Sequence, residues 1–123
     1  KTHTEPLFIA NIEDDKPQYT STLILIEGEK KAGVVYQTLD MDIQVVGLPK
    51  NPSIAMLEGL AEKCKRVFQI IDPDIANDDL QRHKEVFKDY RVVRPPEKID
   101  DMINKYHLQK EHLVKRLKYA ERI

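Results

Sequence analysis

Short apolar runs alternate with stretches of helical periodicity along most of this chain. The run Leu23–Glu27 lacks polar alternation, which is typical of a strand buried on both faces. Three further runs are similar, so strands are predicted at Leu23–Glu27, Asp42–Leu48, Arg66–Asp72 and Asp89–Arg94. Segment 7–22 is expected to contain one short strand followed by a polar linker.

The stretches between these strands predict helices. Ala32, Val35 and Leu39 share one face of a helix expected at Lys30–Leu39. Asn51-Pro52 is typical of an N-cap followed by proline at the first helical position, which predicts a second helix there. A third helix has the stripe Ala76, Leu80, His83 and Phe87, so His83 is expected to pack at the core edge. Two more helices are predicted at Lys98–Tyr106 and Gln109–Glu121.

Strand–helix alternation repeated four times predicts an α/β fold. Such a pattern favours a mainly parallel four-stranded sheet with helices on both faces. We expect an N-terminal extension or linker over 1–20 and the α/β domain over 21–107. Residues 108–123 are expected to form an amphipathic helix that packs on the domain or follows it.

Composition excludes several classes of protein. The net charge of −1 over 123 residues gives no overall attraction to nucleic acids or membranes. Cys64 is the single cysteine, which excludes an internal disulfide and a cysteine-rich zinc site and fits a reducing cytoplasm. No apolar run is long enough to span a bilayer, so no membrane partner is expected. The chain begins at Lys1 without a methionine, and we expect that it derives from a longer polypeptide.

Acidic residues gather where the predicted strands end. Parallel sheets bind ligands outside the carboxyl ends of their strands. Glu27-Gly28 ends the first strand, and Asp72-Pro73-Asp74 ends the third. Mg²⁺ prefers oxygen ligands, usually one or two carboxylates with water and substrate phosphates. Asp72 and Asp74 are therefore candidate Mg²⁺ ligands, and Glu27 could complete the site or act as a base beside it.

Two segments resemble a known family. "LILIEGEKKA" and "VFQIIDPD" are similar to the Toprim domain of bacterial-type primases, topoisomerases and some nucleases. The nearest likeness is to Toprim modules of phage and plasmid primase-type replication proteins. The segment "RVVRPPEKIDDMINKY" resembles the part that follows the fourth strand in primases. The likeness covers Ser21 to Tyr106.

This resemblance implies a Toprim-like, Rossmann-like domain in which Glu27 is a general acid or base. It also implies that Glu27, Asp72 and Asp74 hold Mg²⁺, with Mn²⁺ as an alternative ion. One departure concerns Lys31, because primases usually have an aspartate four residues after the glutamate; its loss removes a ligand of a second metal ion. Lys30 and Lys31 are candidates for phosphate contact or plain helix-surface lysines. Asp100 and Asp101 are helix N-terminal residues or additional acids of the site.

The function implied by the resemblance is Mg²⁺-dependent nucleotidyl transfer in DNA replication, by a primase-type enzyme in the cytoplasm. The expected partners are a single-stranded DNA template, nucleotides, and a replicative helicase or other domains of the same polypeptide. Two alternatives remain open at this point. A Toprim nuclease would use the same acids to hydrolyse phosphodiesters, and a non-catalytic module would only bind nucleic acid or another protein.

Overall fold

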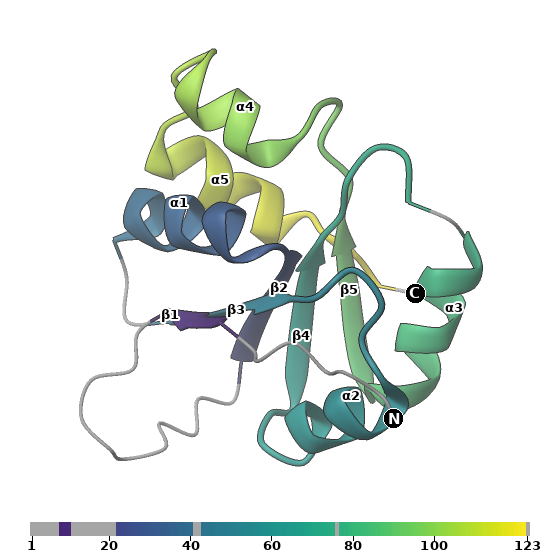
Figure 1. Ribbon diagram of the computed structural model, residues 1–123. Helices are drawn as coiled ribbons and strands as arrows, with labels where there is room; N and C mark the ends of the chain where they lie inside the picture. The colour runs from purple at the N-terminus through teal and green to yellow at the C-terminus, as the bar shows by residue number, and fades with distance from the viewer. Residues whose placement is uncertain (1–7, 11–21, 41–42, 76, 123) are drawn as a thin grey trace.

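The computed structural model describes residues 8–10, 22–40, 43–75 and 77–122. They form one six-stranded sheet with helices on both faces (Figure 1). The strands are β1 (Phe8–Ala10), β2 (Thr22–Glu27), β3 (Gln44–Leu48), β4 (Arg66–Ile70), β5 (Asp89–Val93) and β6 (Glu121–Arg122). The helices are α1 (Glu29–Leu39), α2 (Ile54–Ala61), α3 (Asn77–Val86), α4 (Ile99–Asn104) and α5 (Lys110–Lys118).

The sheet has the order β1-β3-β2-β4-β5-β6. Its four central strands are the four predicted ones, and they are parallel to one another. The two edge strands β1 and β6 are antiparallel to their neighbours. The α/β class and the parallel arrangement are thus confirmed, whereas the sheet is wider than the predicted four strands.

Two layers of helices cover the sheet and bury a core on each face. Helices α1, α4 and α5 lie on one face, and α2 and α3 lie on the other (Figure 1). In β2, Ile24 and Ile26 pack toward the first layer, while Leu23 and Leu25 pack toward the second. All four side chains are at most 3% exposed, which explains why this strand lacks polar alternation.

The predicted start of the second helix is wrong by two residues. Ser53, not Asn51, is the N-cap of α2, and its hydroxyl oxygen accepts a hydrogen bond from the Met56 amide at 3.1 Å. A short hydroxyl side chain at this position satisfies one of the free amides of the first turn. Pro52 lies before the helix, where it is buried, and its carbonyl oxygen accepts a hydrogen bond from Arg82 at 3.5 Å.

The predicted C-terminal helix is also shorter than expected. It ends at Lys118, and Glu121–Arg122 turns back to pair with β5. Ion pairs hold this edge: Arg122 lies 3.5 Å from Asp89, and Glu121 lies 3.7 Å from Arg94. Pairing also covers backbone groups of β5 that would otherwise form an open sheet edge.

The remaining boundaries differ from the predictions by a few residues. The short strand expected within segment 7–22 exists as β1, and the predicted stripe residue Ala76 lies outside the described residues. No helix within the described ranges has both the length and the apolar character needed to cross a bilayer.

Candidate functional site

The order of the strands creates a site at the carboxyl ends of β2 and β4. From β2 the chain passes through α1 to β3 on one side, whereas β4 lies on the other side of β2. At such a reversal the loops that follow the two strands diverge and leave a crevice, which is where open α/β sheets bind ligands. The loop after β2 begins with Gly28, and the loop after β4 contains Asp72-Pro73-Asp74.

A cleft of about 370 Å³ lies at this reversal. Glu27, Asp72 and Asp74 all line it, although 44 residues or more separate Glu27 from the two aspartates in sequence. Three cationic side chains from three other parts of the chain line the same cleft, namely Lys50, Arg82 and Lys98. The structure therefore brings the predicted strand-end acids together and surrounds them with groups that attract phosphate.

Two glycines position Glu27. Gly28 has a φ of +93°, a conformation that other residues rarely adopt, and its amide donates to the Leu48 carbonyl at 2.9 Å. Gly47 lies against this turn: a Cβ on Gly47 would be 3.0 Å from the Gly28 oxygen and 3.1 Å from the Glu29 Cα. The close approach of β3 fixes the turn, so the exposed Glu27 side chain is held at the mouth of the cleft.

The two aspartates lie on a tight turn after β4. The Ile75 amide donates to the Asp72 carbonyl at 3.2 Å, which closes a four-residue turn with Pro73 at its second position. Proline favours that position because its ring fixes φ. Pro73 therefore stiffens the turn that carries both aspartates.

Lys31 has a partner that sequence analysis did not foresee. Its ammonium donates to both carboxylate oxygens of Asp72, each at 2.9 Å. The two side chains are only 15% and 16% exposed. Lys31 lies in the first turn of α1, directly after the Gly28 turn, so the ion pair ties the two loops of the cleft together. Lys30 beside it is exposed.

The donor set fits Mg²⁺ bound together with a phosphate better than Mg²⁺ in an all-protein cage. Among the described residues, no three acidic, histidine or cysteine side chains are arranged to hold a metal ion. Asp72 is engaged by Lys31, whereas Glu27 has no ion-pair or hydrogen-bond partner within the described part of the chain, and the same holds for the exposed Asp74. Mg²⁺ often needs only one or two carboxylates when waters and substrate phosphates complete its shell. The three-acid metal site stays a prediction.

Asp100 and Asp101 lie elsewhere. Both are in the first turn of α4, where acidic side chains stabilise the positive end of the helix. Neither lines the cleft, whereas Lys98, the N-cap of α4, does. The geometry favours the helix N-terminal interpretation of these two acids.

A buried polar network underlies the cleft. Gln69, in β4, also lines the cleft; its Oε1 accepts from the Tyr90 hydroxyl at 2.6 Å and lies 2.7 Å from the His83 Nδ1. All three residues are at most 4% exposed, which confirms that His83 is packed. Burial, followed by the charge of Arg82, lowers the pKa of His83. Gln69 was missed in sequence because one amide in an apolar strand gives no distinct signal.

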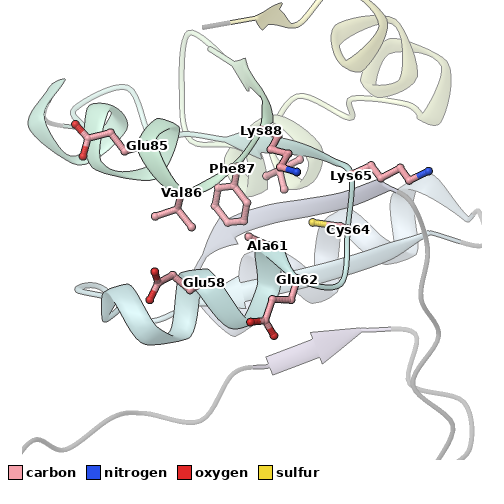
Figure 2. A pocket seen from close by; sticks show the side chains of 10 residues that line it. Glu58, Ala61, Glu62, Cys64, Lys65, Glu85, Val86, Phe87 and Lys88 are labelled. Carbon is pink, nitrogen blue, oxygen red and sulfur yellow. The ribbon is translucent and has the colours of Figure 1, made fainter.

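A larger hollow of about 840 Å³ lies at the opposite end of the sheet. Figure 2 shows it between the ends of α2 and α3, with Ala61, Cys64 and Phe87 on its walls. The Cys64 thiol donates to the Leu60 carbonyl at 3.3 Å, and burial raises its pKa, so it is a poor nucleophile. This hollow lies at the amino ends of β4 and β5, away from the strand-end acids Glu27, Asp72 and Asp74.

Comparison with known proteins identifies the fold. No family model matches the chain, and no curated protein matches it. A primase from Aquifex aeolicus, solved as its zinc-binding and RNA polymerase domains, superposes with a TM-score of 0.68 at 18% identity. The two folds are therefore similar. A primase chain from the bacteriophage T7 structure, with lagging-strand DNA polymerase, an RNA/DNA hybrid and dTTP, gives a TM-score of 0.65, also at 18% identity.

Both alignments cover 84% of this chain. The chain spans only 27% of the Aquifex primase chain and 56% of the T7 chain. At this identity, the likeness concerns the fold and its topology.

Proposed function

We propose that this chain is the Toprim-type catalytic module of a primase-class replication protein, which joins nucleotides with the help of Mg²⁺. The observation behind the proposal is the convergence of Glu27, from the end of β2, with Asp72 and Asp74, from the turn after β4, in one cleft. The similarity of the fold to primase domains supports it, and so does the resemblance of these residues to the Toprim motifs.

Each group has a role in this proposal. Glu27 exchanges a proton with the attacking or leaving oxygen, since its exposed carboxylate stands free at the cleft mouth. Asp74 and Asp72 hold the metal ion, whose contribution is to neutralise charge on the reacting phosphate. The cations Lys50 and Arg82, which line the same cleft, orient the remaining phosphate oxygens. The substrates are nucleotides and a single-stranded DNA template.

The test is an assay that separates transfer from hydrolysis. The polypeptide that contains this chain is incubated with Mg²⁺ or Mn²⁺, ribonucleotides and an end-labelled single-stranded DNA. New oligoribonucleotides that are lost in the Asp74→Asn variant support the proposal. Shortening of the labelled DNA instead would establish a nuclease, and binding of the DNA without either product would establish a non-catalytic module. A Glu85→Gln variant, which loses one negative charge at an exposed position outside the cleft, controls for the altered net charge.

A further inference from the structure

The Lys31–Asp72 ion pair lies within the proposed metal site, and it uses both oxygens of the Asp72 carboxylate. A bare Mg²⁺ ion that approached Asp72 would face an ammonium group 2.9 Å from each oxygen that it needs. An Mg²⁺ ion on either oxygen would lie close to the Lys31 ammonium in a partly buried place, where the repulsion between the two cations is strong. Mg²⁺ and Lys31 therefore compete for Asp72.

The charge of the whole cleft points the same way. Four carboxylates line it, namely Glu27, Asp72, Asp74 and Asp79, together with the cations Lys50, Arg82 and Lys98. Lys31 supplies the fourth positive charge through Asp72. The cleft without ligand is thus balanced, with no net excess of negative charge to attract a free dication.

We propose that Lys31 is a counterion that keeps Asp72 from taking up Mg²⁺ alone and releases it when the phosphates of a nucleotide arrive with the ion. A phosphate group gives the Lys31 ammonium a new anionic partner. The loss of the ion pair with Asp72 is therefore offset only when phosphate is present. The site would accordingly bind the magnesium–triphosphate complex rather than the two parts in turn. This inference rests on the proposed function and adds Lys31 as a positioning residue.

The inference requires that removing the ammonium has opposite effects on two ligands. Lys31→Met in the 123-residue chain keeps the aliphatic stem and removes the charge. Titration calorimetry at constant ionic strength then compares MgCl₂ alone with the preformed magnesium complex of tripolyphosphate. We expect Lys31→Met to bind MgCl₂ alone about tenfold more tightly than the wild type. It should bind the triphosphate complex about tenfold more weakly. A tenfold change in affinity corresponds to the lower end of the free energies of hydrogen bonds to charged groups.

Three further variants act as controls. Lys84→Met loses the same charge at an exposed position of α3 and should match the wild type. Lys31→Arg keeps a cation that can donate to both oxygens of a carboxylate, and it should restore weak binding of MgCl₂ alone. Lys31→Gln repeats the comparison if methionine disturbs packing, which circular dichroism melts would reveal. A purely structural role for Lys31 predicts that both affinities fall together in Lys31→Met.

The outcomes distinguish this inference from the proposed function. In one outcome the wild type binds the triphosphate complex tightly, but the charge-removing Lys31 variants bind MgCl₂ as the wild type does. This result would overturn the role of Lys31 and leave the proposed function standing. Absence of binding of either ligand by the wild type and every variant would overturn both.

Discussion

The close packing of Gly47 against the Gly28 turn permits a sharp test of how the fold positions Glu27. Replacement of Gly47 by alanine adds one methyl group to a buried position of β3. That methyl carbon would lie 3.0–3.1 Å from three backbone atoms of Gly28 and Glu29. Backbone atoms cannot rotate away as the end of a flexible side chain can, so the turn itself must shift.

The expected loss of stability in Gly47→Ala comes from overpacking. An inserted methyl group in a well-packed interior costs about 1–3 kcal/mol. Alanine also reduces the conformational entropy of the unfolded chain, which stabilises by about 0.4–1 kcal/mol. Near the midpoints of these two ranges, the net loss of stability for Gly47→Ala is about 1–2 kcal/mol. For a domain of this size, this corresponds to a decrease in melting temperature of about 3–10 °C.

Gly59→Ala is the matched control. Gly59 lies inside α2, and a Cβ there would meet no atom within 4 Å. Alanine in a helix interior is more favourable than glycine by about 0.5–1 kcal/mol, so this variant should melt higher than the wild type. The same substitution should therefore lower the stability at position 47 and raise it at position 59. Thermal melts followed by circular dichroism measure both.

The same shift of the turn should displace the Glu27 carboxylate. We expect nucleotidyl transfer by Gly47→Ala to fall by about tenfold or more at a temperature where the variant remains folded, since small errors of position lower the rate strongly. A Gly47→Ala variant that melts at or above the wild-type temperature would refute the reasoning. So would a variant that is less stable but fully active, because Glu27 would then not depend on this contact.

Three further predictions concern the acid and the network under the cleft. Glu27→Gln should leave the melting temperature within about 2 °C of the wild type and lower nucleotidyl transfer by about 10²–10⁴-fold, and unchanged turnover would remove Glu27 from the chemistry. Burial, and after it the charge of Arg82, lowers the pKa of His83 below its ordinary 6.5. As the pH falls through 6.5, this histidine therefore gains a proton in the unfolded chain before it does so in the folded chain. The free energy of unfolding should therefore be highest above about pH 7.5 and should decrease as the pH falls through 6.5. Urea titrations at pH 8 and pH 6 should show a smaller difference in this free energy for His83→Gln than for the wild type. Tyr90→Phe removes the 2.6 Å hydrogen bond to Gln69 and should cost about 0.5–1.5 kcal/mol in the same titrations, whereas no loss would mean that the bond adds nothing to stability.

The sequence by itself determined the elements and the chemistry at their ends. The apolar stretch Leu23–Ile26 required burial on both faces, because a strand turns alternate side chains to opposite sides. That requirement led to helices on both faces and a parallel sheet, as observed. Local spacing also located Glu27, Asp72 and Asp74 at strand ends, and the topology rule for parallel sheets brought them to one edge.

Tertiary structure alone decided which groups meet. Lys31 and Asp72 are 41 residues apart, and no local period relates a lysine of α1 to an aspartate in the turn after β4. The same holds for Gln69 and His83, whose contact depends on how α3 packs over β4. Short edge strands such as β6 likewise form only because a neighbour already exists, since two residues hold too few hydrogen bonds to form a strand alone. Local patterns encode what each segment becomes, whereas contacts between distant segments depend on strand order and packing, which are properties of the whole chain.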